Sequence, residues 1–125
     1  LRGVPMPVPS NIFVALFTAN PTDANITANE VTLAAWPSYA RQNAAAAGAI
    51  ATGWAAPVNG VTSNALALSF PQHNGASATI VTHVGLYDAV TGGNLLYHSP
   101  LSPSKTINPT DALTFLAGTI TVTLD

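Results

Sequence analysis

The chain has 125 residues, lacks cysteine, and carries only 6% charged residues with a formal net charge of −2. Phosphate binding requires a basic patch, so a total of 3 Lys and Arg residues argues against nucleic acid as a partner. The lack of cysteine excludes a disulfide framework and any thiolate site, and no apolar run approaches the ~20 residues of a membrane span. Because soluble domains normally carry ~25% charged residues, the low charge favours a surface that contacts neighbouring subunits over one coated with Thr, Ser and Asn.

Residues 1–10 are predicted to form an extended, polyproline-like arm, because residues 4–9 read Val-Pro-Met-Pro-Val-Pro. Proline lacks the N–H donor that a central strand requires, so this segment is not expected inside a sheet. It does not have the charged start and apolar core of a signal peptide either. The arm either packs on its own domain or the next subunit, or it is a loose terminus. In the first case its apolar residues are candidate interface residues: Val4, Met6 and Val8.

Residues 11–18, NIFVALFT, are predicted to form a strand that is apolar on both faces. Such a strand is covered on both sides, on one side by the core and on the other by a loop or a neighbouring subunit. Phe13 and Phe17 share one face and are therefore candidate interface residues. Residues 19–29 are rich in turn signals, and a short strand is expected at residues 30–33.

The middle of the chain combines alanine-rich, aromatic and turn-like segments. Residues 44–51 are rich in Ala, but Gly48 and Gly53 interrupt the pattern, so a helix is the less favoured interpretation. Residues 64–70 alternate between large apolar and small side chains, which predicts a half-buried strand. Three aromatic residues could stack on sugars but more often fill a core or a subunit contact, so they complete the set of interface candidates: Trp36, Tyr39 and Trp54.

The strongest local signal is that of a β-hairpin. Two runs rich in β-branched and aromatic residues, 80–89 and 94–99, flank a VTGG turn at residues 90–93, where paired glycines supply the positive φ angles of a tight reversal. Asp88 is predicted to accept hydrogen bonds from the backbone of this turn. Near the end of the chain, residues 118–125 read GTITVTLD, a two-residue period typical of a strand with one apolar and one polar face.

Short strands separated by turn signals predict an all-β fold, either an antiparallel β-sandwich or a jelly-roll-like barrel. The usual size of domains predicts one β-sandwich domain over residues 11–125, preceded by the extended Pro-rich arm at residues 1–10. Without disulfides, this fold must be held together by packing and hydrogen bonds alone.

No arrangement of residues in the sequence indicates catalysis. The histidines have no nucleophile context such as G-x-S-x-G, and the acidic residues lie near turns or chain ends, which is unlike a paired-carboxylate site. His83 and His98 could meet across the hairpin and hold a metal, but no clustered third ligand is evident, so hydrogen bonding to neighbours is favoured. We therefore expect no enzymatic activity, no cofactor and no metal.

Four segments of the sequence resemble the small phage virion proteins that are commonly labelled tail fibre protein. The segments are NIFVALFTANPTDAN at residues 11–25, SYARQ at residues 38–42, VTHVGLYDAVTGGNLLYHSPLSPSKTI at residues 81–107, and DALTFLAGTITVTLD at residues 111–125. The resemblance implies a structural protein of the virion that is assembled in the host cytoplasm. Proteins of this kind are associated with the tail or decorate the capsid as cement proteins.

The resemblance therefore implies one of two functions. The first is capsid decoration, in which a homo-oligomer, expected to be a trimer, binds the major capsid protein on the outer surface and stabilises the shell. The alternative is a tail fibre or tail-associated module that contacts tail proteins and recognises host surface glycans through Trp36, Tyr39 or Trp54. Neither function involves nucleic acid or a membrane.

Overall fold

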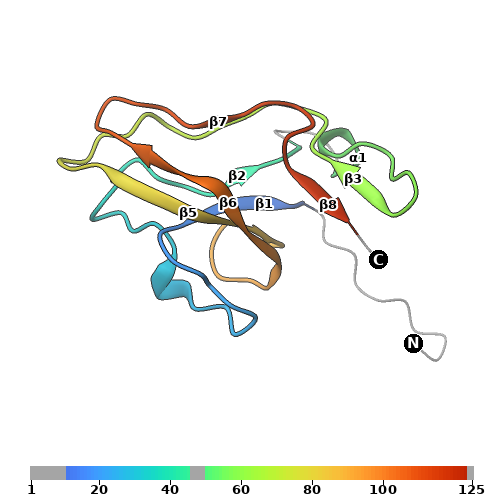
Figure 1. The fold of residues 1–125 in the computed structure, drawn as a ribbon, viewed down its shortest axis with the longest axis horizontal. Helices are drawn as coiled ribbons and strands as arrows, with labels where there is room; N and C mark the ends of the chain where they lie inside the picture. Colours follow the sequence, from blue (N-terminus) through green and yellow to red (C-terminus); the bar gives the residue numbers. More distant parts are fainter. Residues whose placement is uncertain (1–10, 46–49, 124–125) are drawn as a thin grey trace.

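The computed structural model describes residues 11–45 and 50–123, so the predicted arm at residues 1–10 lies outside them. Within the described residues the fold is all-β and antiparallel and contains no closed barrel, which confirms the predicted fold class (Figure 1). The main sheet has the strand order β2-β1-β5-β6, with these bounds: β1 (Phe13–Phe17), β2 (Gln42–Asn43), β5 (Thr79–Tyr87) and β6 (Leu95–Ile107). Two small sheets accompany it: β3 (Val61–Ser63) with β8 (Thr121–Thr123), and β4 (Leu68–Ser69) with β7 (Thr114–Phe115).

The predicted hairpin is present, with β5 inside the main sheet and β6 at its edge. Strand β5 pairs antiparallel with β6 on one side and with β1 on the other. Gly92 and Gly93 have φ angles of 59° and 74°, so both occupy the left-handed region that the turn requires. The carboxylate of Asp88 accepts hydrogen bonds from the backbone N–H and the side-chain amide of Asn94, at 2.7 and 2.8 Å. Asp88 is thus an acceptor as predicted, but its donor is Asn94, the residue after the turn, and not the backbone of residues 91–93.

Strand β6 is longer than the sequence predicted, because it continues past residue 99 through Pro100 and Pro103 to Ile107. The strand order places β6 at the edge of the main sheet. At an edge, one row of backbone N–H groups faces away from the neighbouring strand, so a proline there removes no hydrogen bond of the sheet. The pairing of β6 with β5 also shifts register between Val81 and His83, opposite this proline-containing stretch.

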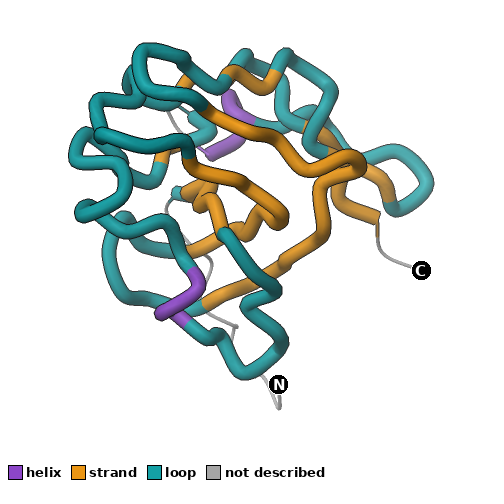
Figure 2. Tube along the Cα trace, turned by 60° about the vertical axis from the view of Figure 1, so that its left-hand side comes forward, coloured by secondary structure: helices purple, strands orange, loops and turns teal. Residues whose placement is uncertain are grey.

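One large hydrophobic cluster joins the main sheet to the two small sheets, as expected of a sandwich. It combines Val14 and Leu16 of β1 and Val81 of β5 with Leu68 of β4 and with Ile120, which precedes β8. Loops make up much of the chain around these strands (Figure 2). Two short helical segments, η1 (Thr27–Asn29) and α1 (Ile50–Gly53), lie within those connections.

The opposite face of β1 is covered by the chain itself. Ala15 and Phe17 form a second buried cluster with Tyr87, and the rings of Phe17 and Tyr87 stack with their centroids 6.3 Å apart. The hydroxyl of Tyr87 donates to the side-chain carbonyl of Asn25, which ties the loop after β1 to this cluster. Of the two predicted covers for this face, a loop or a subunit, the structure shows a loop.

Two predicted strands are shorter than expected. Residues 30–33 contribute only an isolated bridge between Glu30 and Phe17. Of residues 64–70, only Leu68–Ser69 form a strand. The reason is the buried side chain of Asn64, which accepts from the N–H of Ile120 at 2.8 Å and donates to the carbonyl of Leu66 at 2.8 Å. These bonds hold the local backbone away from regular pairing.

The alanine-rich segment at residues 44–51 is described only in part. Ala44 and Ala45 are buried, and the four-residue helix α1 begins at Ile50. Residues 46–49 lie outside the described part of the chain. A short helix is thus present where the sequence favoured non-helical structure, and Gly53, the second interrupting glycine, is its last residue.

Candidate functional site

The structure distributes the predicted interface residues between the interior and the surface. Phe17 and Trp36 are fully buried and Tyr39 is 8% exposed, so none of the three is available to a partner in this fold. Phe13 is half-buried and packs against the second cluster. Trp54 is half-buried and lines a groove that is described below. The remaining candidates lie outside the described residues: Val4, Met6 and Val8.

Trp36 and Tyr39 are structural because their polar atoms are already bonded inside the chain. The indole N–H of Trp36 donates to the Ser38 hydroxyl at 3.1 Å, and the Trp36 ring stacks on His73 with centroids 4.8 Å apart. The Tyr39 hydroxyl donates to Glu30 Oε1 at 2.9 Å and accepts from the Leu16 N–H at 3.0 Å. The sequence left both a core position and a subunit contact open for these residues, because an aromatic ring gives the same signal in either place.

A buried ion pair that the sequence did not predict links this region to the hairpin turn. Arg41 donates to both carboxylate oxygens of Glu30, with Nε–Oε1 and Nη2–Oε2 distances of 2.8 Å each. Its Nη1 donates to the carbonyls of Ala89 and Gly92 at 3.0 and 2.7 Å. Its guanidinium carbon lies 3.5 Å from the centroid of the Tyr87 ring. Arg41 therefore fastens the hairpin turn to the core. Apart from the small number of charged residues, nothing in the sequence indicated this role.

Burial and charge act in opposite directions on this cluster. Burial alone would lower the pKa of Arg41, but the hydrogen bonds and the charge of Glu30 outweigh it and leave that pKa raised. Burial, with a smaller contribution from the charge of Glu30, raises the pKa of Tyr39 well above its ordinary value. Arg41 therefore stays charged and Tyr39 stays neutral over the ordinary pH range, which suits a structural role better than proton transfer.

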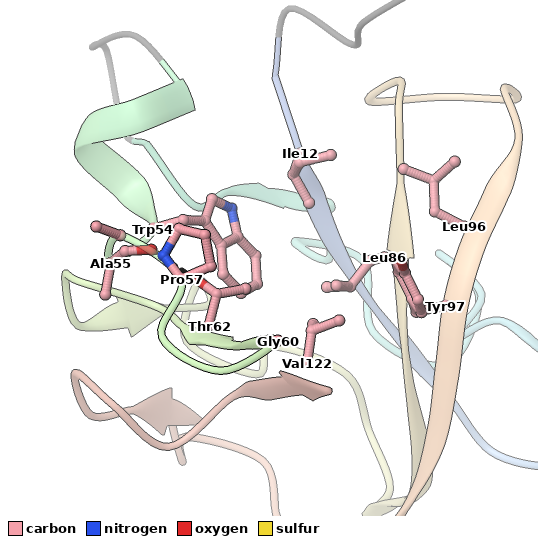
Figure 3. A pocket seen from close by; sticks show the side chains of 11 residues that line it. Ile12, Trp54, Ala55, Pro57, Gly60, Thr62, Leu86, Leu96, Tyr97 and Val122 are labelled. Carbon is pink, nitrogen blue, oxygen red and sulfur yellow. Dashed lines mark hydrogen bonds between the residues drawn. The ribbon is translucent and has the colours of Figure 1, made fainter. Parts of the chain in front are cut away.

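An apolar groove of about 550 Å³ opens between the main sheet and the loop that follows α1. We call it the Trp54 groove. In Figure 3, Trp54 and Pro57 stand on one side, Leu86 and Tyr97 stand on the other, and Ile12 lies between them. None of the lining side chains is charged. The full set of lining residues is Ile12, Trp54, Ala55, Ala56, Pro57, Gly60, Thr62, Leu86, Leu96, Tyr97 and Val122.

Local hydrogen bonds position the Trp54 side of this groove. The Ala55 N–H donates to the Ser63 carbonyl at 2.8 Å, and the Thr62 hydroxyl donates to the Ala55 carbonyl at 2.6 Å, so the loop is fastened to β3. Trp54 itself bridges to Asn64. Its indole Nε1 is buried and has no hydrogen-bond partner among the residues that the structure describes. An unpaired buried donor is unusual in folded proteins, and it calls for an explanation.

The two histidines of the hairpin do not form a metal site. His98 Nε2 lies 2.9 Å from a carboxylate oxygen of Asp23, and His83 Nδ1 lies 2.9 Å from the Thr82 hydroxyl. In the part of the chain that the structure describes, no three His, Asp or Glu side chains gather closely enough to hold an ion. Over the same residues, no helix has the length and hydropathy needed to cross a bilayer.

The structure is a charge-poor, antiparallel all-β module with an open apolar groove. The sequence profile of a phage family, described as Podophage GP4 fiber I protein gp80, matches residues 1–123. The chain belongs to this family, so it is a phage fibre-type structural protein associated with the virion, and the resemblance noted in the sequence is confirmed. No curated protein sequence matches the chain.

Proposed function

We propose that the protein is a non-enzymatic subunit of the phage tail fibre apparatus and works by binding other virion proteins as a homo-oligomer. The observation that carries this proposal is an open, uncharged groove on a member of a fibre family. Filling such a groove is favourable because it removes apolar surface from water. An occupant that does this is itself apolar, such as a protein surface or an apolar segment. A homotrimer remains the expected assembly, with tail proteins as its neighbours.

The rest of the surface supports an assembly role. Leu33, Val58 and Leu116 are 61%, 68% and 66% exposed, while only 6% of the sequence is charged. Interface centres are depleted in charge and rich in apolar area, so a surface of this composition is suited to contact with other subunits.

Family membership favours the tail over the capsid as the location. Capsid decoration was the first expectation from the sequence, but no contact or surface of the described chain points specifically to a capsid lattice. The fibre family instead supports the alternative, a tail-associated protein. Glycan recognition through Trp54 is less suited to the groove, because sugar binding needs polar side chains around an aromatic ring to bond the hydroxyls, and this lining is almost entirely apolar.

Immunogold labelling of purified virions tests the proposed location. Antibody against the recombinant protein should label the tail or its fibres, and labelling spread over the capsid shell would instead restore the decoration hypothesis. Analytical ultracentrifugation of the purified chain should show a homo-oligomer, whereas a monomer at all concentrations would contradict the assembly role. A glycan array provides the third measurement, since reproducible sugar binding that is lost in Trp54→Ala would favour host recognition.

A further inference from the structure

The Trp54 groove has the properties of a site that a polypeptide segment fills. The residues that line it come from the loop after α1, from both hairpin strands and from β8. It leaves apolar side chains open to solvent, including Tyr97, which is 44% exposed. The ring of Trp54 lines the groove opposite Leu86 and Tyr97 (Figure 3).

The sequence of residues 4–9, Val-Pro-Met-Pro-Val-Pro, matches the chemistry of this groove. Proline-rich segments in the polyproline II conformation bind grooves lined by aromatic rings, because they lose little conformational entropy on binding. Their backbone carbonyls have no internal partner and can remain solvated at the open side of a groove. Residues 1–10 include one charged side chain, Arg2, which precedes the proline-containing stretch, so the apolar part can be buried without burying a charge.

The position of the segment relative to the groove favours a neighbouring copy as the host. Ile12 belongs to the groove wall, so the N-terminal segment begins beside the groove of its own chain. Val4, Met6 and Val8 each precede a proline, a position at which extended backbone is favoured. Only residues 10 and 11 separate this stretch from Ile12, which leaves little chain in which to change direction. Ten residues of polyproline II span about 31 Å, which is enough to reach an adjacent subunit.

We propose that residues 4–9 of one copy lie in the Trp54 groove of a neighbouring copy, with Val4, Met6 and Val8 covering its apolar lining. The exchange joins subunits around an oligomer without any change in the core of each one. This inference rests on the proposed function, because it requires that the protein assemble with itself. It gives the apolar groove and the proline-rich segment one shared role.

Disulfide trapping tests the exchange directly, because the natural chain contains no cysteine and provides no background. One full-length chain carries Met6→Cys, and a second chain with a different tag carries Ala56→Cys in the exposed groove loop. Under mild oxidation the mixture should give a disulfide-linked pair that carries both tags, because docking brings the two Cα atoms within the ~7 Å that a disulfide can bridge. The matched control is Ala24→Cys, an exposed alanine in the loop that covers the opposite face of β1.

Each outcome of the trapping experiment decides the inference. Trapping with Ala56→Cys at a yield roughly tenfold above Ala24→Cys supports it, since docking raises the effective concentration of the two thiols. Equal yields would overturn it. A double variant with both cysteines on one chain that closes only within that chain would also overturn it, because the segment would then occupy its own groove.

A second variant checks the inference without a covalent bond. Met6→Asp places a charge on the docked segment, so the dissociation constant of the oligomer should rise roughly tenfold or more. The control Ile80→Asp changes an isoleucine that is 54% exposed and lies outside the groove, so it should leave the dissociation constant unchanged. Ultracentrifugation distinguishes failure of the segment exchange from failure of the assembly role. If Met6→Asp leaves the dissociation constant of the oligomer unchanged, the exchange is overturned but the assembly role is kept. If the wild-type chain is monomeric at all concentrations, both are overturned.

Discussion

The ion pair between Arg41 and Glu30 provides the strongest test of how the fold is held together. Arg41→Met keeps most of the aliphatic stem against Tyr87 but removes the bonds to Glu30 and to the carbonyls of Ala89 and Gly92. The side chains of Arg41 and Glu30 are 5% and 15% exposed, so Glu30 would be left as a nearly buried charge without a cation, with only the hydrogen bond from the Tyr39 hydroxyl remaining. This is the situation in which losing one member of an ion pair is most costly.

The expected loss of unfolding free energy in Arg41→Met is about 3–4 kcal/mol. Removing one partner of a buried pair costs about 3–5 kcal/mol. We expect the lower part of that range because Gly92 is exposed and Ala89 is half-buried, so water can replace part of what their carbonyls lose. A loss of this size is a large fraction of the about 5–15 kcal/mol that stabilises a typical domain.

Urea unfolding followed by tryptophan fluorescence measures this loss, with two companion variants as controls. Arg41→Lys keeps the charge but cannot reach Glu30 and the two carbonyls together, so an intermediate loss of about 1–3 kcal/mol is expected. The double variant Arg41→Met with Glu30→Gln should be more stable than Arg41→Met alone, because no charge is left unpaired. A loss below about 1 kcal/mol in Arg41→Met would refute the claim that this pair fastens the hairpin turn to the core.

Three further predictions concern the turn and the buried amide. Gly93→Ala should destabilise the fold more than Gly92→Ala in the same urea assay: both have positive φ, but an added Cβ at Gly93 would meet Asp88 Oδ1 at 2.5 Å, whereas at Gly92 it meets nothing within 4 Å. Equal losses would contradict this packing argument. Asn64→Ala should cost about 2–4 kcal/mol, since it leaves the N–H of Ile120 and the carbonyls of Leu66 and Leu116 without their partner; a near-neutral result in thermal unfolding would show that water replaces the amide. The hydrogen bonds from the backbone and side chain of Asn94 lower the pKa of Asp88 from 3.8, so its contribution to stability is complete above that value and is lost as pH falls through the lowered one. Urea midpoints measured against pH should therefore fall less steeply in Asp88→Asn than in the natural chain, and identical slopes would exclude this role.

Local patterns in the sequence were sufficient for the elements that depend on neighbouring residues. The paired glycines of the VTGG turn predicted the hairpin because few other residues adopt two consecutive positive φ angles. The two-sided apolar pattern of residues 11–18 predicted a strand buried on both faces, and β1 is such a strand. The same local patterns missed the far half of β6, because whether a proline interrupts a strand depends on which strand lies beside it.

The candidate site could be predicted only in part, for a reason that the aromatic residues make plain. Trp36 and Trp54 gave the same signal in the sequence, yet one stacks on His73 in the core and the other lines an open groove. The difference arises from contacts between segments that are distant in the chain, as does the pairing of Arg41 with Glu30. The sequence by itself therefore determined the all-β class, the hairpin and the scarcity of charge, since these follow from composition and local backbone preference. Tertiary structure alone decided which apolar side chains are buried and which remain open to a partner, because burial depends on what the rest of the chain places against each side chain.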